Sequence, residues 1–346
     1  MIETLSIKNF RQIKDQTIEL SPVVVVIGPN NGGKTSFLQA ICLFATALQT
    51  WSAVVQQRTT NKTNRKTSVA IQLENLVNIP IAAYRELWTD LQLRSRTTTA
   101  EGKTATQAIK IEIHATGYTQ QQYWRIGFEF DYGRDSLIYV RLAHNEQGEQ
   151  YDFPPILTNE HIGYLPAMSG LNPWEDKLEK GSILRHIGNG KTADVLRNLC
   201  YLLYTHEDAK VWQQFTQQIE QLFQIQLQNP QYFPSSGLLK MTYHEGNKKD
   251  VDLSALGSGA KQTMLLFAYM WGFPNTVTLL DEPDAHLEVI RQKNIYDQIS
   301  DIAKQNHTQL IIASHSESVL STAFGKDTVI SSVFGQLAKV NHKTHI

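Results

Sequence analysis

The chain contains little of what marks secreted, disulfide-rich or membrane-spanning proteins. Only two of its 346 residues are cysteines, and both lie in apolar segments (Cys42 and Cys200), which excludes a disulfide framework or a cysteine-rich metal site. The opening segment MIETLSIKNF lacks the apolar core of a signal peptide. No apolar run approaches the ~20 residues that span a bilayer. We therefore expect a cytoplasmic protein without a membrane partner.

A strong excess of charge of either sign is also missing. The 32 Lys and Arg against 33 Asp and Glu give a formal net charge of -1, so no global attraction to nucleic acid is expected. Any basic surface must be local. Residues 56–68 form one such segment, in which a solvated loop is the ordinary interpretation and DNA contact the alternative. Its basic residues are Arg58, Lys62, Arg65 and Lys66.

The length exceeds that of one average core and predicts a composite α/β protein. Residues 1–27 read as strands that end in a nearly continuous valine run, VVVVI, and the apolar residues after Lys34 suit a buried helix. The polar segment 94–107 reads as a flexible loop. Residues 109–142 alternate apolar and polar side chains, which predicts an antiparallel meander with one wet face.

The second half of the chain turns helical and then returns to short apolar strands. An aromatic and aliphatic stripe with a spacing of three or four residues predicts the core-facing side of a helix. The segments TVTLLDEP and TQLIIASHS read as buried strands, separated by a helix over about residues 287–305. The stripe comprises Trp212, Phe215, Ile219 and Leu222.

A glycine-rich loop stands between the valine strand and the helix that follows. Gly28, Gly33, Lys34 and Thr35 match G-x-x-x-x-G-K-[ST] with a strand before it and a helix after it, as a P-loop requires. Its backbone N–H groups and the helix N-terminus would face phosphate oxygens, with Lys34 at the β- and γ-phosphates and Thr35 on Mg²⁺. We therefore predict ATP and Mg²⁺ as cofactors. The nucleotide-binding residues are Gly28, Pro29, Asn30, Asn31, Gly32, Gly33, Lys34, Thr35 and Ser36.

Two later strands end in side chains that suit phosphate chemistry. Asp281 at a strand tip is predicted to reach Mg²⁺, and Glu282 to orient and deprotonate the attacking water. His315, at the end of the next strand, is predicted to sense the γ-phosphate, although a strand-end histidine is often structural. With Lys34, these residues form the predicted catalytic set.

A second small-residue segment precedes another apolar helix. In LSALGSGAKQ, Gly257, Ser258 and Gly259 form a loop before a helix that is predicted to begin near Lys261. A free helix N-terminus preceded by Ser and Gly favours an anion, here the nucleotide of another subunit. The GNGKT segment beginning at Gly188 does not complete a second P-loop, because the first glycine of the pattern falls on Arg185. It predicts a loop with Thr192 capping a helix.

Taken together, these motifs resemble the ABC-type ATPase heads of the SMC and RecF kind. The N-F-R segment, the GPNNGGKT loop, LGSGAKQ, LLDEPDAHLE and IIASHS occur in the family's order. The long coiled coils of SMC proteins are missing, and the middle of the chain, with YLPAMSG, is closer to the OLD-like ATPases, including the ATPase component of PARIS. The resemblance implies a P-loop fold with an antiparallel β meander and an inserted helical subdomain.

The resemblance also implies a division into four parts. Residues 1–55 would form the N-terminal part of the ATPase core, 56–160 the flexible loops and β lobe, 161–250 a mainly helical subdomain, and 251–346 the C-terminal part of the core. Two departures stand out: Gly257 replaces the first serine of the usual signature, and no convincing Q-loop glutamine is found.

By resemblance, two chains would sandwich two ATP molecules in a head-to-tail homodimer or higher oligomer. Lys34, Thr35, Asp281, Glu282 and His315 would serve one site, Ser258 and Gly259 of the second chain would close it, and Arg11 would lie near the adenine or the phosphates. OLD-like relatives commonly act with a TOPRIM nuclease in anti-phage defence, so a partner nuclease or toxin is expected. No acidic cluster remains after residue 336 to build a nuclease, which implies a stand-alone subunit or a shortened relative.

Three other functions compete with this interpretation. A RecF-like ATPase that binds DNA directly in repair is the main alternative and depends on the basic segment 56–68. A transporter ATPase is disfavoured by the N-F-R start and by the long spacing between the P-loop and Asp281. A scaffold that binds ATP without hydrolysing it is the third.

Overall fold

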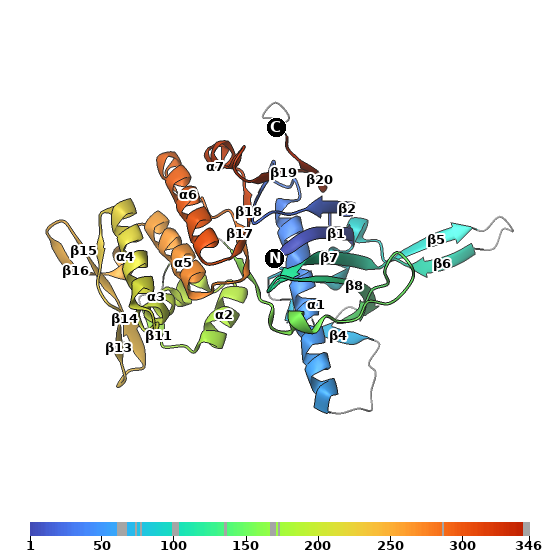
Figure 1. Ribbon diagram of the computed structural model, residues 1–346, viewed down its shortest axis with the longest axis horizontal. Helices are drawn as coiled ribbons and strands as arrows, with labels where there is room; N and C mark the ends of the chain where they lie inside the picture. The colour runs from blue at the N-terminus through green and yellow to red at the C-terminus, as the bar shows by residue number, and fades with distance from the viewer. Residues whose placement is uncertain are drawn as a thin grey trace. The chain divides into compact units, whose positions relative to one another are not determined.

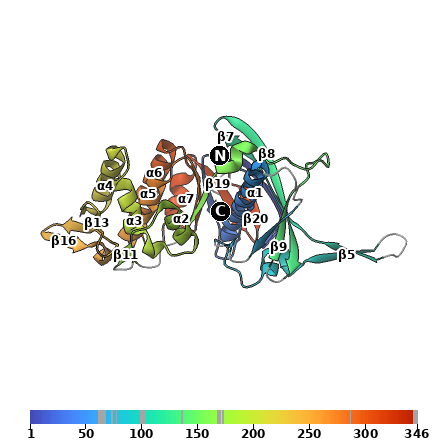
Figure 2. The same ribbon diagram turned by 90° about the horizontal axis from the view of Figure 1, so that it is seen from below.

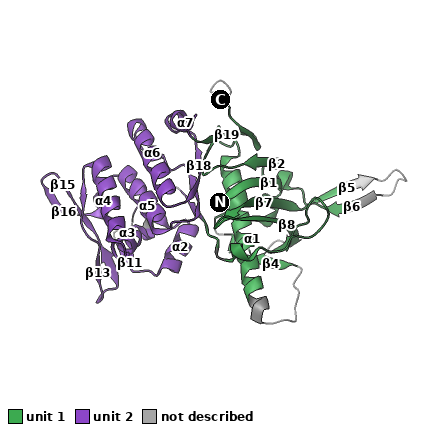
Figure 3. Ribbon diagram, in the orientation of Figure 1, with its two compact units in different colours: residues 1–162, 327–346 green, residues 163–326 purple. Residues whose placement is uncertain are grey.

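A computed structural model describes residues 1–60, 68–72, 75–76, 78–98, 104–134, 137–166, 171, 174–285 and 287–341. The chain divides into two compact units, shown in two colours in Figure 3. Unit 1 contains residues 1–162 and 327–346, and unit 2 contains residues 163–326. The finer division into four parts remains a prediction.

The larger sheet of unit 1 has the strand order β2-β1-β7-β8-β9-β4, and all its neighbouring strands are antiparallel. Alternate residues of β7 are buried, beginning with Ile111 and Ile113, while those between them are partly exposed. The meander predicted from the alternation is therefore confirmed. The strands are β1 (Ile2–Phe10), β2 (Ile13–Glu19), β4 (Val69–Gln72), β7 (Ile111–Thr119), β8 (Gln122–Arg134) and β9 (Leu137–Leu142).

Helix α1 (Lys34–Thr60) lies along this sheet in both views of Figures 1 and 2. The ring of Phe44 meets that of Phe128 on β8 edge-on, with 5.5 Å between the centroids. Within the part of the chain that the structure describes, α1 alone is long and apolar enough to cross a membrane, but most of its apolar stretch is buried. We interpret it as the core helix of unit 1.

The two ends of the chain meet in a second group of strands. Strand β3 (Val23–Ile27) pairs in parallel with β19 (Thr328–Val333), which pairs antiparallel with β20 (Gln336–Lys339). All five residues of β3 are buried, as its valine run predicts for a strand covered on both faces. The P-loop is therefore built beside residues that lie about 300 positions later in the chain.

The segment predicted as a second flexible loop is instead a hairpin. Strands β5 (Arg94–Thr98) and β6 (Thr104–Ala108) pair antiparallel, from Arg94 opposite Ala108 to Thr98 opposite Thr104. Its Thr-rich sequence lacks an apolar face, so backbone pairing rather than burial holds it. The side chains of residues 58, 62, 65 and 66, considered for DNA contact, lie outside what the structure describes. Among the described residues, unit 1 also contains the 3₁₀ turns η2 (Tyr84–Leu87), η3 (Thr89–Leu91) and η4 (Pro155–Asn159).

Unit 2 packs its helices around α5, and buried residues run along the whole of that helix. Strands β17 and β18 are parallel and in register, with Asp281 opposite Ala313. The predicted stripe on α4 is confirmed for Trp212, Phe215 and Ile219, which are buried, whereas Leu222 is only partly buried. The helices are α2 (Lys180–Gly188), α3 (Leu196–Tyr204), α4 (Ala209–Phe223), α5 (Ser258–Gly272), α6 (Val289–Gln305) and α7 (Glu317–Ala323).

The strands of unit 2 are short, and two small three-stranded sheets border the helices. Thr192 does not cap α3 as predicted, because a 3₁₀ turn (η5, Thr192–Asp194) intervenes and Val195 takes the cap position. The strands are β10 (Ile162–Leu165), β11 (Glu175–Asp176), β12 (Gln226–Leu227), β13 (Gln231–Phe233), β14 (Leu238–Lys240), β15 (Thr242–Glu245), β16 (Lys248–Asp252), β17 (Val277–Asp281) and β18 (Gln309–Ser314).

Candidate active site

The P-loop of unit 1 folds around the ammonium group of Lys34. Lys34 is only 5% exposed, and its Nζ donates hydrogen bonds to the carbonyl oxygens of Gly28 (2.9 Å) and Pro29 (3.1 Å). The helix α1 begins at Lys34, so the loop delivers both a fixed positive charge and the first N–H groups of a helix to one place. Such an arrangement is a binding site for phosphate.

The hairpin β19–β20 supports this loop from the far end of the chain. Ser332 Oγ donates to the carbonyl oxygen of Gly32 (3.0 Å), and the Gly335 N–H donates to the same oxygen (3.0 Å). A methyl group on Gly28 would collide with the carbonyl oxygen of Ser332, which explains the need for glycine there. Sequence reasoning missed Ser332 and Gly335, because nothing in their local sequence indicates a partner so distant along the chain.

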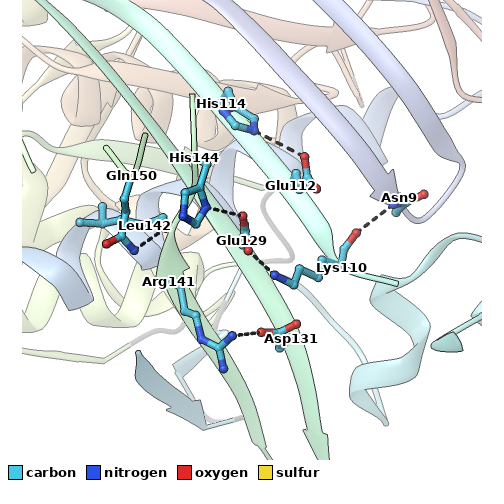
Figure 4. Close-up of polar contacts among 10 residues, drawn as sticks. All are labelled: Asn9, Lys110, Glu112, His114, Glu129, Asp131, Arg141, Leu142, His144 and Gln150. Atoms are coloured by element: carbon cyan, nitrogen blue, oxygen red, sulfur yellow. Dashed lines mark hydrogen bonds and ion pairs between the residues drawn. The ribbon is translucent and has the colours of Figure 1, made fainter. Parts of the chain in front are cut away.

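Arg11 lies on the turn between β1 and β2 beside the P-loop residue Ser36, and both line a cavity of about 550 Å³. The backbone of Arg11, with a φ of 50°, and that of Asn9, with a φ of 57°, are both in the left-handed region. The Nδ2 of Asn9 donates a hydrogen bond to the carbonyl oxygen of Lys110 at 2.9 Å (Figure 4). The guanidinium donates to the Pro80 carbonyl at 3.2 Å. Burial lowers the pKa of Arg11, and Glu86 opposes that effect.

Figure 4 also shows polar contacts on the strands next to the turn between β1 and β2. On the outer face of β8, Glu129 accepts from Lys110 and lies 3.5 Å from His144, while Asp131 pairs with Arg141 at 2.9 Å. The side chain of Lys110 is thereby fixed, and its backbone carbonyl holds Asn9. Asn9 of the N-F-R segment is therefore held by the backbone of a residue whose side chain is itself paired with Glu129.

In unit 2, the predicted metal ligand and general base stand at the end of β17. The Tyr164 hydroxyl donates to Asp281 Oδ2 at 3.1 Å, a contact that the sequence did not reveal. Glu282 has a φ of 49°, a costly conformation for a non-glycine residue, and its N–H donates to the Ala313 carbonyl at 2.9 Å. Its Oε1 lies 3.2 Å from Nδ1 of His315. The structure therefore brings the predicted base and phosphate sensor together.

A buried hydrogen bond ties the two strand ends to each other. Ser314 Oγ donates to Oδ2 of Asp284 at 3.0 Å, and the Ser316 N–H donates to the same hydroxyl at 3.0 Å. Asp284 is only 6% exposed, and burial raises its pKa. This contact fixes the loops that carry Glu282 and His315. Sequence reasoning missed it because the two residues are 30 positions apart.

The predicted signature segment begins α5 earlier than expected. The helix starts at Ser258 instead of near Lys261, so Ser258 and Gly259 lie in its first turn and Gly257 is the N-cap. The cap has no side chain to bind the first N–H groups, which leaves them available to an anion. Ser258 is exposed. No cluster of three or more metal-ligating side chains occurs among the residues that the structure describes.

A buried ion network anchors the segment before α5. Arg197 is fully buried, and its Nη2 donates to Oδ1 of Asp252 at 3.0 Å while Nη1 lies 3.7 Å from the buried Glu175. Asp252 Oδ1 also accepts from the N–H of Ser254 at 2.8 Å, which begins the turn η6 (Leu253–Ala255). Burial raises the pKa of Glu175, and hydrogen bonds from Arg197 and Asn198 oppose that effect.

Arg197→Met is expected to lower the free energy of unfolding by about 3–5 kcal/mol, because it leaves a buried carboxylate without its counter-charge. Lys210→Met, at an exposed position of α4, should change it by no more than about 0.5 kcal/mol. Chemical denaturation of both variants measures the difference. Equal stability of the two would contradict the anchoring role of Arg197.

Two family models match the chain, one in each half. The model described as "AAA ATPase domain" matches residues 1–164, and the model described as "AAA domain, putative AbiEii toxin, Type IV TA system" matches residues 173–321. Among curated proteins, 57 residues are 40% identical to the uncharacterized protein MJECL10 of Methanocaldococcus jannaschii, over 16% of this chain and 26% of that protein. A further match of 43 residues is 44% identical to the OLD nuclease of Thermus scotoductus.

The second match spans 12% of this chain and 8% of the OLD nuclease, so the chain covers only a small part of either relative's length. Solved structures cover nearly the whole chain. The SMC head bound to the C-winged helix domain of ScpA has a TM-score of 0.56 at 16% identity, covering 99% of this chain and 98% of that one. RecF-ATPrS of the RecFOR pathway has a TM-score of 0.52 at 13% identity, covering 98% of each chain.

The fold is that of the P-loop ABC-type ATPases, and both halves of the chain match ATPase domain models. The chain is therefore similar to ATPase domains in both halves and shares the fold of SMC heads and RecF, in line with the resemblance that its motifs carry. Lys34 and Arg11 belong to unit 1, whereas Asp281, Glu282 and His315 belong to unit 2.

Proposed function

We propose that the chain is a Mg²⁺-dependent ATP hydrolase that uses ATP to join two copies of itself. The dimer would control a partner nuclease or toxin in bacterial anti-phage defence. The observation that carries hydrolysis is the contact of 3.2 Å between Glu282 and His315 at the ends of two parallel strands. A P-loop alone would support binding, but this pair supplies a proton acceptor and a group that orients it.

The roles proposed for single residues at the nucleotide follow from their chemistry. The ammonium of Lys34, already fixed by two loop carbonyls, would contact the β- and γ-phosphates. Thr35 and Asp281 would hold Mg²⁺, which usually takes one or two protein oxygens together with phosphates and water. When bound, the metal would neutralise charge on the phosphates. Tyr164, by its hydrogen bond, would keep Asp281 turned toward that role.

Hydrolysis would depend on the orientation of Glu282. Its carboxylate would accept a proton from the water that attacks the γ-phosphate. Nδ1 of His315 contacts the same carboxylate, which would leave Nε2 to reach a phosphate oxygen. The hydrogen bond between Asp284 and Ser314 would hold both residues in place.

Dimerisation is supported by two exposed features of unit 2. The N-terminus of α5 carries Ser258 at an exposed position with free N–H groups, as a site for a second nucleotide would need. Val289 and Ile290, directly after the Glu282 loop, are 69% and 83% exposed. Adjacent aliphatic side chains left in water beside a functional loop favour an interface.

Light scattering with saturating Mg·ATP tests the dimer directly. The molar mass is expected to rise from 39.2 kDa to about twice that value in Mg·ATP, while the Lys34→Ala variant remains a monomer. Ile290→Asp should prevent the rise without preventing ATP binding, since it places a charge in the interface. Gln305→Asp adds the same charge at an exposed position at the other end of α6 and should still dimerise. A wild-type monomer in Mg·ATP would refute the proposed switch.

The effector part of the proposal draws support from the OLD-like motifs and from the short match to an OLD nuclease. Co-purification of the ATP-bound dimer with the product of a neighbouring nuclease or toxin gene tests it. The alternative is a DNA-binding ATPase like RecF. It requires that DNA stimulates hydrolysis, and that alanine at the basic positions of residues 58–66 removes the stimulation.

A further inference from the structure

The turn between β19 and β20 contains a residue that does not suit its backbone. Val333 pairs with Gln336, so Phe334 and Gly335 form a two-residue turn, with φ values of 48° and 78°. Turns with two positive φ values favour Asn-Gly or Asp-Gly, because a bulky side chain is strained in the left-handed region. Phenylalanine at this position is therefore a residue type that the conformation of the turn disfavours.

Packing within the protein does not explain the presence of a phenylalanine at position 334 either. Its side chain is 81% exposed, which places it with Ile290 as the most exposed large apolar residues that the structure describes. A strained, solvent-exposed aromatic residue beside a P-loop suggests a role in contacting something outside the fold.

Phe334 borders the cavity of about 550 Å³ that also touches Arg11 and Ser36. Ser36 lies in the first turn of α1, directly after Lys34 and Thr35. A triphosphate on the P-loop would therefore extend its ribose and base toward this cavity. Leu91 of the turn η3 and Trp88, which caps that turn, also line the cavity.

Most polar groups around the cavity already have partners within the chain. Trp88 Nε1 donates to the Ile109 carbonyl at 2.6 Å, and Thr89 Oγ1 donates to that of Ile13 at 3.2 Å. Asp90 lies 3.6 Å from Lys14. The Phe334 ring, Leu91 at 56% exposed and the guanidinium plane of Arg11 add flat or apolar surfaces to the lining. Within the described chain, the buried Nε of Arg11 also has no acceptor.

We infer that this cavity binds the base of the nucleoside triphosphate and that Phe334 stacks on it. The inference rests on the proposed ATP site and specifies how that site recognises the base. Stacking recognises the flat face of a base and not the hydrogen-bonding groups at its edge. Adenine and guanine nucleotides therefore bind with similar affinity, since strong discrimination requires polar groups that one base leaves unpaired.

Calorimetric titration of the full chain with ATP, GTP and inorganic triphosphate, each with Mg²⁺, tests the inference. Phe334→Asn removes the ring and gives the turn its preferred Asn-Gly sequence, so loss of folding does not confound the result. It weakens ATP and GTP binding about 10-fold, in the range of base stacking, and leaves inorganic triphosphate unchanged. Phe334→Tyr retains the ring and binds all three as the wild type does.

The outcomes separate this inference from the function on which it rests. Unchanged ATP affinity in Phe334→Asn overturns the stacking role, and so does an equal loss for ATP and inorganic triphosphate, which would indicate a damaged P-loop. Preference of the wild type for ATP over GTP by about 100-fold or more overturns recognition by stacking. Failure of the wild type to bind any of the three refutes the proposed ATP site itself.

Discussion

Glu282→Gln is expected to convert the chain into a stable ATP-bound dimer that hydrolyses ATP at least about 100-fold more slowly than the wild type. Glutamine has the same shape as glutamate and retains an oxygen that can face His315, but it cannot accept the proton of the attacking water. Binding should persist, because the phosphate contacts belong to Lys34 and the P-loop. Phosphate release and light scattering, measured on the same sample, check both parts.

Glu288→Gln provides the matched control. Glu288 lies in the same loop region, caps α6 and pairs with Arg291 at 3.4 Å on the surface, so its loss should leave hydrolysis nearly unchanged. If Glu282→Gln hydrolyses ATP at the wild-type rate, Glu282 is not the general base. If it is inactive but stays monomeric in ATP, the link between nucleotide and dimerisation is wrong.

A mixture of two inactive variants is expected to regain activity. Lys34→Ala removes the phosphate contact of a chain's own P-loop, and Ser258→Arg blocks the surface that would close the partner's site. Each variant alone should be close to inactive. A dimer of one chain of each kind has one intact site out of two, so about a quarter of wild-type hydrolysis should return in a 1:1 mixture if chains pair at random, and up to about half if only mixed dimers form.

The substitution at Ser258 is suited to this test because the residue is exposed in the first turn of α5. An arginine there should not disturb the helix, and circular dichroism can verify that both variants fold. A mixture that stays inactive would show that the sites are not shared between chains. Full activity of Ser258→Arg alone would show that Ser258 is not part of the active site.

Local patterns account for the parts of the site that could be predicted. The P-loop follows from a buried strand, a loop of glycines and a helix within fourteen residues, Val23–Ser36. The strand ends carrying Asp281, Glu282 and His315 were recognised because apolar runs that stop at a polar residue indicate where a buried strand emerges. In each case, the signal and the structure occupy the same short segment.

The remaining features required information that short segments do not contain. The sequences of β5 and β6 have no apolar alternation, so the period of two that identifies a strand is missing although the two strands pair. The start of α5 was placed too late because Ser and Gly usually indicate a loop, whereas here they begin the helix. The supports Ser332, Ser314 and Tyr164 act through contacts between distant positions.

The hydrogen bond from Ser332 to Gly32 spans 300 residues and has a consequence for how the protein is made. Ribosomes add roughly 5–20 residues per second, so the P-loop segment waits about 15–60 s before the strand that braces it is synthesised. During that interval the nascent chain has the nucleotide-binding sequence without its supporting hairpin. Competence to bind ATP should therefore arise only after the β19–β20 hairpin has been synthesised.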